Sequence, residues 1–252
     1  MPLAYVLQHI RCEPPGRCSG PLRDRGYVVE TVELAEGGGL PDWREAGLVL
    51  AMGGPMGAYD EAVHPWLAAE KRWIAAAVRA GTPYFGVCLG AQLLAACLGA
   101  RVYRGARPEI GIYDDVELTA EAGHDPVFAH APARITTLQW HSDTFELPAG
   151  ARRLATSAAY ANQAFAWRRA YGLQFHLEAS AELAATWLEV PDYAAEARRE
   201  LGSQALERLA GTLYELGGAP PLARELFGRW IEHVVRPARA PAAAREPGAG
   251  AL

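Results

Sequence analysis

Residues 84–92 read Tyr84-Phe85-Gly86-Val87-Cys88-Leu89-Gly90-Ala91-Gln92. A short apolar run, typical of a strand, leads through the pattern G-x-C-x-G into a segment with helical character, so the cysteine falls on a sharp strand-to-helix turn. Small residues are needed on both sides of such a turn, because the backbone at the cysteine is strained and flanking side chains would collide. This turn predicts the βαβ organisation from which the rest of the chain can be interpreted.

Apolar runs that precede the turn predict further strands with little polar alternation, as expected when both faces of a parallel sheet are covered. The four strands predicted in the first hundred residues are Leu3–Gln8, Tyr27–Val32, Leu48–Met52 and Tyr84–Val87. Helical spacing of apolar residues predicts helices from about Pro65 to Ala80 and from Gly90 to Leu98. The sequence therefore predicts an α/β fold with a mostly parallel, doubly wound central sheet flanked by helices.

Beyond residue 100 the pattern changes to short strands joined by turns, which predicts an antiparallel or mixed extension of the same sheet. These strands are Ile112–Leu118, Arg134–Leu138, Arg153–Thr156, Ala164–Trp167 and Tyr171–Phe175. Three helices are expected after them, at about Ala181–Leu188, Tyr193–Leu216 (with Leu201, Leu209, Leu213 and Leu216 near one face) and Pro221–Val235. We expect residues 1–190 to form the main domain, 191–235 to pack on it as C-terminal helices, and the Ala/Pro/Arg/Gly-rich residues 236–252 to be a disordered tail.

Composition narrows the classes of function. The 252-residue chain has a net charge of −5, almost no lysine and scattered arginine, which argues against nucleic acid or an anionic membrane as the main partner. No run approaches the roughly 18 apolar residues of a membrane helix, and the N-terminus lacks the basic region of a signal peptide. The four cysteines match neither a metal-knuckle spacing nor a disulfide framework. We therefore expect a cytoplasmic protein with reduced thiols and no metal site.

Cys88 is the candidate nucleophile. The turn places its sulfur exposed at the carboxyl edge of the sheet and at a helix N-terminus, where the helix dipole favours the thiolate. The amide of Leu89 then points at a developing oxyanion. The alternative is a buried structural cysteine between two glycines. Cys97, Cys12 and Cys18 lack these surroundings and are interpreted as core or plain thiols.

A thiol nucleophile needs a base, and the base works best when a carboxylate fixes its tautomer. His176 and Glu178 follow an apolar run and are two residues apart, so both point to the same side in extended backbone. The alternative is an exposed strand-end histidine beside an unrelated glutamate. Among the seven histidines only His141 shares the strand-end position and the nearby carboxylate.

A glycine-rich loop follows the strand at Leu48–Met52 and reads Gly53-Gly54-Pro55-Met56-Gly57. Adjacent glycines let the backbone present an amide to a ligand, and the amide of Gly54 would complete an oxyanion hole with that of Leu89. The alternative is a generic strand-to-helix turn. A phosphate loop is excluded because its lysine and hydroxyl are missing.

Together the three segments closely resemble the class I (triad-type) glutamine amidotransferases over about residues 1–190. The motifs G-G-P, G-x-C-x-G-x-Q and Q-F-H-x-E appear in order as Gly53-Gly54-Pro55, Gly86-Val87-Cys88-Leu89-Gly90-Ala91-Gln92 and Gln174-Phe175-His176-Leu177-Glu178. The chain resembles a stand-alone form of the amidotransferase domain of guanosine monophosphate synthetase. It departs from the pattern at Leu177, where proline is usual; proline there supplies no chemical group, so we expect the change to be tolerated.

The resemblance implies a Cys88-His176-Glu178 triad that releases ammonia from glutamine through a cysteinyl γ-glutamyl thioester, without cofactor or metal. It also implies substrate contacts from a set of residues at the strand ends, namely Gly53, Gly54, Pro55, Gln92, Trp140, His141, Ser142 and Asp143. His141 is accordingly better interpreted as pocket lining than as the base, and Glu109-Ile110-Gly111 as a structural family segment.

Three functional hypotheses remain. The first is a glutaminase or amidotransferase subunit whose ammonia-accepting synthase is encoded elsewhere, since the chain has no nucleotide-binding loop and few residues beyond the family region. The second is a hydrolase of γ-glutamyl peptides or conjugates with the same triad. The third is a non-catalytic binding protein with a relic triad; a complete triad disfavours it, because only chemistry requires a strained thiol beside a base.

Overall fold

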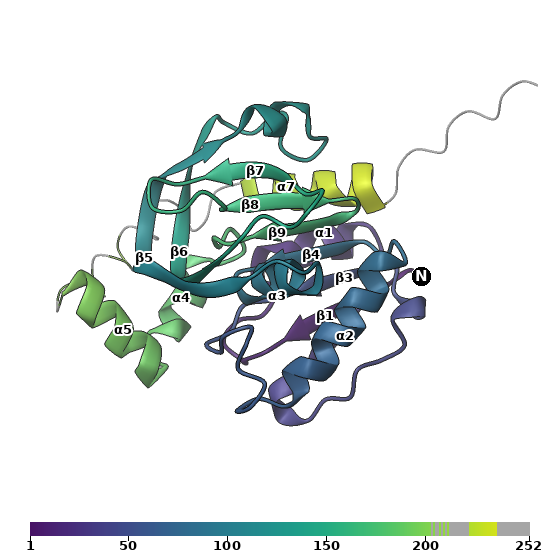
Figure 1. The fold of residues 1–252 in the computed structure, drawn as a ribbon, viewed down its shortest axis with the longest axis horizontal. Coiled ribbons are helices and arrows are strands. Elements are labelled where there is room, and N and C mark those ends of the chain that lie inside the picture. The colour runs from purple at the N-terminus through teal and green to yellow at the C-terminus, as the bar shows by residue number, and fades with distance from the viewer. Residues whose placement is uncertain (203, 205–206, 208, 210, 212–221, 236–252) are drawn as a thin grey trace, which may run out of the picture.

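The computed structural model describes residues 1–202, 204, 207, 209, 211 and 222–235, and the nine strands found there form one sheet (Figure 1). Its strand order is β2-β1-β3-β4-β9-β8-β7-β5-β6. The first five strands in this order pair in parallel and the rest in antiparallel fashion. The predicted fold, a parallel core with an antiparallel extension, is confirmed.

The parallel half contains the strands that the sequence makes most apolar: β1 (Leu3–Gln8), β2 (Val28–Glu33), β3 (Leu48–Ala51), β4 (Tyr84–Val87) and β9 (Ala170–Leu173). Every residue of β3, β4 and β9 is buried, since helices cover both faces of the sheet there. The strand predicted at Tyr171–Phe175 ends early, at Leu173. The chain then crosses to β6, where the amide of His176 donates to the carbonyl of Leu138 over 2.8 Å.

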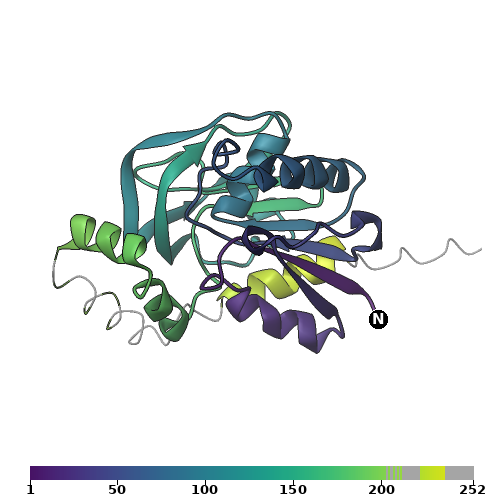
Figure 2. The same cartoon turned by 90° about the horizontal axis from the view of Figure 1, so that it is seen from below.

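Helices lie on the two faces of the sheet (Figure 2). On one face pack α2 (Trp66–Arg79) and α3 (Leu89–Cys97); on the other pack α1 (Ser19–Asp24), which the sequence did not predict, and α7 (Leu222–Trp230). Each layer has its own apolar core, and α7 contributes Phe227 and Trp230, which pack edge-on against Phe85 of β4. A π-helical turn, Ile231–Val235, continues α7. Short 3-10 turns occur at Gly16–Cys18, Leu34–Glu36, Trp43–Glu45 and Ala120–His124.

The antiparallel half consists of β5 (Val102–Leu118), β6 (Arg134–Phe145), β7 (Arg152–Thr156) and β8 (Ala164–Trp167). Strands β5 and β6 are much longer than their predicted cores, because they pair with each other along a two-stranded ribbon with bulges. The polar half of β6, residues 139–145, resembles a loop in sequence. Pairing with β5 satisfies its backbone and buries its side chains, and neither effect is visible locally.

Two helices, α4 (Ala181–Trp187) and α5 (Pro191–Leu201), lie beside the β5–β6 ribbon and share a third apolar core with it. The helix predicted over Tyr193–Leu216 is wrong in extent: α5 ends at Leu201, before Gly202 with φ of 82°. Leu201 is 37% exposed, whereas Leu209 is buried. Residues 212–216 and the tail at 236–252 lie outside the described residues. None of the helices in the described part of the chain is both long enough and apolar enough to span a membrane.

Candidate active site

Cys88 lies on the turn between β4 and α3 with φ of 50° and ψ of −107°, a conformation that non-glycine residues rarely adopt. A Cβ added at Gly86 would lie 2.5 Å from the carbonyl atoms of Gly90, and one added at Gly90 would lie 2.2 Å from the carbonyl oxygen of Ala51. Both contacts involve backbone, which cannot swing aside, so only glycine fits at these two positions. A strained residue held this firmly is typical of a functional site.

The Cys88 thiol is more enclosed than the sequence predicts: the residue is only 6% exposed, although it lines a pocket. Burial raises the pKa of the thiol, whereas His176 acts to lower it. Burial therefore opposes the thiolate, which His176 favours. The side-chain amide of Gln174 donates to the sulfur over 3.7 Å, and the sulfur lies 3.8 Å from the carbonyl oxygen of Trp140.

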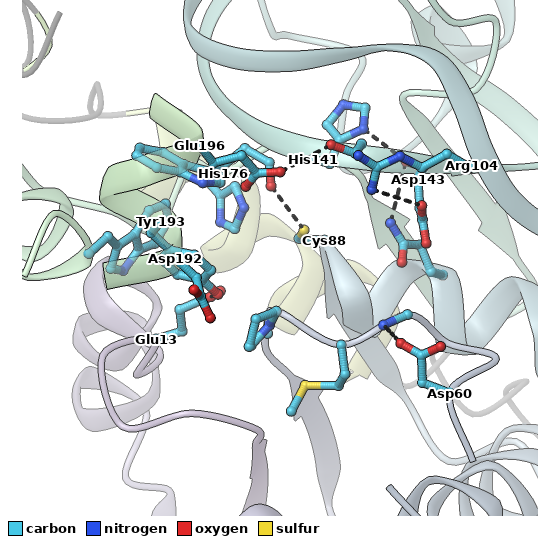
Figure 3. A pocket seen from close by; sticks show the side chains of 18 of the residues that line it. Glu13, Asp60, Cys88, Arg104, His141, Asp143, His176, Asp192, Tyr193 and Glu196 are labelled. Atoms are coloured by element: carbon cyan, nitrogen blue, oxygen red, sulfur yellow. Dashed lines mark hydrogen bonds and ion pairs between the residues drawn. The ribbon is translucent and has the colours of Figure 1, made fainter. Parts of the chain in front are cut away.

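His176 and Glu178 form a buried pair in which Nδ1 of the imidazole lies 2.7 Å from Oε1 of the carboxylate. This contact leaves Nε2 for the thiol, and Figure 3 shows the imidazole beside the Cys88 sulfur. Burial acts to lower the pKa of His176, but Glu178 and then Cys88 act in the opposite direction and prevail, so the pKa is raised well above its usual value. Trp187 of α4 packs edge-on against the imidazole, with ring centroids 4.8 Å apart, and fixes its plane.

The glycine-rich loop after β3 approaches the same turn. The amide of Gly90 donates to the carbonyl of Met52 over 3.1 Å, which ties the loop to the start of α3. A Cβ added at Gly53 would lie 1.9 Å from Oε2 of Glu13 and 3.3 Å from Cε1 of His176. Glycine at position 53 therefore allows a carboxylate and the imidazole to approach the loop closely.

A buried ion pair lies behind this loop. Nδ1 of His9 lies 3.0 Å from the carbonyl oxygen of Gly53, and Nε2 lies 2.8 Å from Oε1 of Glu70. A backbone carbonyl and an ionised carboxylate both accept hydrogen bonds, so this arrangement favours hydrogen on both ring nitrogens, the imidazolium form of His9. Burial acts to lower the pKa of His9, but Glu70 and the Gly53 carbonyl prevail and raise it. The ring also stacks on Trp66, at 5.8 Å between centroids.

These elements surround a pocket of about 480 Å³, within the range of roughly 300–1,000 Å³ that is common for small-molecule sites. In Figure 3 Cys88 lies in the middle, with Arg104 and Asp143 on one side and Glu13, Asp192 and Tyr193 on the other. The lining residues that the sequence assigned to the site are Gly54, Pro55, Cys88, Gln92, Trp140, His141, Ser142, Asp143 and His176. Gly53, Leu89 and Glu178 are buried and do not line the pocket; Glu178 is the partner of the imidazole.

His141 is held in the pocket wall by both ring nitrogens. Nε2 lies 3.0 Å from Oε2 of Glu109 and Nδ1 lies 2.9 Å from the carbonyl oxygen of Asp143. Glu109 also accepts from Ser157 and Gln163. Burial acts to raise the pKa of Glu109, but His141 and then these two contacts prevail and lower it. The His141–Glu109 pair thus shapes the wall of the pocket, while the His176–Glu178 pair faces the thiol.

The structure adds pocket residues that sequence reasoning missed. Arg104 lies 3.9 Å from Oδ1 of Asp143, and Glu13 follows β1 on a loop that had no motif to mark it. Helices α4 and α5 supply a further set that only tertiary packing brings to the site, namely Trp187, Asp192, Tyr193, Ala195, Glu196 and Arg199. Among the described residues no group of three or more His, Cys, Asp or Glu side chains is arranged to hold a metal ion.

The family model described as glutamine amidotransferase class-I matches residues 23–189, which include all three motifs of the site. The chain belongs to this family. A putative glutamine amidotransferase-like protein, YfeJ of Salmonella typhimurium, is 32% identical over 183 residues, covering 71% of this chain and 76% of that protein. The glutamine-hydrolysing GMP synthase of Thermomicrobium roseum is 37% identical over 133 residues, which are 52% of this chain but only 23% of the synthase.

Solved structures agree with this membership of the class I glutamine amidotransferases. A glutamine amidotransferase from Thermotoga maritima superposes with a TM-score of 0.82 at 32% identity, covering 93% of this chain and 98% of that one. A glutamine amidotransferase from Methylobacillus flagellatus has a TM-score of 0.76 at 24% identity, covers 98% of this chain and 99% of its own, and shares the fold. The resemblance inferred from the three motifs is therefore confirmed.

Proposed function

We propose that this chain hydrolyses the side-chain amide of glutamine, or of a γ-glutamyl compound, through a thioester on Cys88. The observation that carries the proposal is a thiol held in a strained left-handed turn beside an imidazole whose far nitrogen is 2.7 Å from a buried carboxylate. A fold gains no stability from this combination, which fits nucleophilic catalysis. The name of the T. roseum relative, a glutamine-hydrolysing synthase, also supports it.

In this mechanism His176 takes the proton of the Cys88 thiol as the sulfur attacks the amide carbonyl carbon. Glu178 stabilises the resulting imidazolium, in keeping with the raised pKa of His176. The imidazolium then protonates the leaving nitrogen, the C–N bond breaks, and ammonia departs from glutamine. Water, deprotonated by His176, attacks the thioester and releases glutamate and the thiol.

The amides of Gly54 and Leu89 are the proposed oxyanion donors. Leu89 is the first residue of α3, so its N–H has no intrahelical acceptor. The described residues contain no cis peptide bond, and across a trans peptide the N–H points opposite to the preceding carbonyl. Because the carbonyl of Gly53 faces His9, the N–H of Gly54 faces away from His9, and Gly54 itself lines the pocket.

The amino-acid end of the substrate is proposed to bind on the side of Gln92. Arg104 and Asp143 form an ion pair in this wall, and together they offer a cation and an anion to the carboxylate and ammonium of a zwitterion. Gln92 is held in place by donating to Oε1 of Gln174 over 3.2 Å. Ammonia transfer to a separate synthase remains part of the proposal.

Labelling with the glutamine analogue diazo-oxo-norleucine tests this function. We expect one covalent adduct on Cys88, together with release of ammonia and glutamate from glutamine. Cys88→Ala should abolish both, whereas Cys97→Ala, which removes a buried thiol outside the pocket, should leave both intact. Glu178→Gln should retain the fold and lower kcat by about 10³–10⁴, because the imidazolium loses its counter-charge. If the chain neither forms the adduct nor hydrolyses glutamine or any γ-glutamyl amide, the proposed function is wrong.

A further inference from the structure

The pocket continues past Cys88 to a second wall, which we call the α5 wall: Glu13 from the loop after β1, Trp187 of α4, and Asp192, Tyr193 and Glu196 of α5. In Figure 3 its residues Glu13, Asp192 and Tyr193 lie across the nucleophile from Arg104 and Asp143. If the amino-acid end of the substrate occupies the Arg104 side, the scissile bond lies at the sulfur, and whatever is attached to the amide nitrogen extends to the α5 wall. Ammonia leaves most of that volume unused.

Glu13 is the most unusual member of this wall. The residue is only 4% exposed, and its Oε2 is buried without a hydrogen-bond partner among the described residues. Its Oε1 accepts from the hydroxyl of Tyr193, and burial raises the pKa of its carboxyl group. A buried acceptor without a donor is costly unless a ligand supplies one.

The position of Glu13 is fixed from several directions. Trp187 donates from Nε1 to the carbonyl of Cys12 over 2.7 Å, and the amide of Arg17 donates to the carbonyl of Glu178 over 2.9 Å. The glutamate therefore belongs to a loop anchored to both α4 and the catalytic segment. A side chain held in this way does not move easily toward solvent, so the buried Oε2 without a hydrogen-bond donor is a fixed part of the pocket.

The remaining groups of the α5 wall are acidic or aromatic. Asp192 and Glu196 add two carboxylates, and Arg199 is the one cation of α5 that lines the pocket, 3.7 Å from Glu196. Trp140, Trp187 and Tyr193 pack together there, with centroids 5.7 to 6.5 Å apart. Carboxylates beside aromatic rings are the chemistry that recognises an organic ammonium group.

We propose that the α5 wall is a leaving-group subsite for a positively charged amine, so that the preferred substrate is a γ-glutamyl amide of an aliphatic diamine or polyamine. This inference rests on the proposed function. The Cys88 sulfur forms a bond to the γ-carbonyl carbon, the C–N bond breaks, and the amine leaves with the proton that His176 took from the thiol. Water then cleaves the thioester, so one amide and one water give glutamate and one alkylammonium ion.

Three γ-glutamyl amides of matched length test the subsite in the full chain: those of 1,4-diaminobutane, n-butylamine and 4-aminobutyrate. Their leaving groups end in an ammonium, a methyl and a carboxylate. The quantity to compare is kcat/KM, because it covers the steps up to acylation, while the leaving group is still bound. We expect the diaminobutane amide to exceed the butylamide by about tenfold or more, as one charge-assisted hydrogen bond supplies, and the 4-aminobutyrate amide to be the poorest.

Substitutions in the α5 wall test whether its carboxylates cause the preference for the diaminobutane amide. Glu13→Gln and Asp192→Asn should each lower the ratio of kcat/KM for the diaminobutane amide over the butylamide by about threefold or more. Glu189→Gln, an exposed acid between α4 and α5 that does not line the pocket, should leave the ratio unchanged. Asp192 is exposed, so Asp192→Asn should fold and its kcat/KM ratio can be measured even if Glu13→Gln fails to fold.

The outcomes separate the two proposals. Cys88-dependent hydrolysis of all three amides at equal kcat/KM, or a preference for the carboxylate, overturns the cation subsite and leaves the proposed function standing. A preference for the diamine that persists in both Glu13→Gln and Asp192→Asn overturns the assignment to the α5 wall. No Cys88-dependent hydrolysis of any amide or of glutamine overturns both proposals.

Discussion

Replacing the His9–Glu70 ion pair behind the glycine-rich loop should disturb the orientation of the proposed oxyanion donor without lowering the stability of the fold. His9 and Glu70 are fully buried, and His9 holds the Gly53 carbonyl at 3.0 Å. We consider the double substitution His9→Leu/Glu70→Leu, which removes both charges and the hydrogen bond to the loop. It leaves apolar side chains in a region that already contains Trp66.

The expected magnitudes differ for stability and for activity. Removing His9 alone leaves Glu70 buried without its counter-charge, which typically costs about 3–5 kcal/mol, whereas replacing a whole buried pair by apolar residues is often neutral or stabilising. The double variant should therefore unfold at a denaturant concentration close to that of the wild type. Its kcat/KM should nonetheless fall by about 10–100-fold, short of the 10²–10³ that follows complete loss of an oxyanion donor.

The pair also predicts how stability depends on pH. The pKa of His9 is raised in the folded state, so the contribution of the pair is fully present below the unfolded pKa of about 6.5 and is lost as pH rises through the raised value. Urea unfolding at a series of pH values should show a larger loss in the wild type than in the double variant, where the raised pKa of His176 still contributes but that of His9 does not.

The assay compares three quantities in the double variant: the midpoint of urea unfolding, kcat/KM for glutamine, and the rate of Cys88 alkylation by iodoacetamide. Alkylation forms no oxyanion, so it should stay near the wild-type rate and show that the thiol and the imidazole are intact. A folded double variant with wild-type kcat/KM would refute the argument that His9 orients the Gly54 amide.

Two further changes probe the turn itself. Gly90→Ala would place a Cβ 2.2 Å from the backbone oxygen of Ala51, so it should lower the free energy of unfolding in urea by about 3 kcal/mol or more. Gly123→Ala is the control and should cost little, because nothing lies within 4 Å of the added atom. Equal unfolding midpoints for the two variants would contradict the close approach at Gly90. Burial raises the pKa of Cys88 and His176 opposes it, so iodoacetamide alkylation should accelerate as pH rises toward and above 9. His176→Ala should move this profile to higher pH, and an unchanged profile would mean that the imidazole does not act on the thiol.

The prediction of the fold succeeded where local sequence carries the constraint. Strands β1, β4 and β8 have the predicted bounds, because their apolar runs are short and bounded by turn residues. Strands β5 and β6 were predicted too short, since the polar stretch at 139–145 becomes strand only through pairing with a distant partner. The helix after Tyr193 was predicted too long, because leucine spacing suggested continuity across Gly202.

The same division applies to the site. The motifs alone marked Cys88, His176 and Glu178, because a strained turn and a base with its carboxylate each need particular residues at fixed local spacing. The residues that face them across the pocket carry no such pattern. Glu13 and Tyr193 are 180 positions apart in the chain, and only the folding of α5 against the loop after β1 brings hydroxyl and carboxylate into contact.

The sequence by itself determined the fold class, the family and the three residues proposed to carry the chemistry, since backbone strain and short-range spacing are local properties that substitution would destroy. The tertiary structure alone decided the enclosure of the thiol, the burial of the His9–Glu70 pair and the acidic wall beyond the nucleophile. Those features depend on burial and on charges that meet across long separations in the chain, and neither is encoded at any single position.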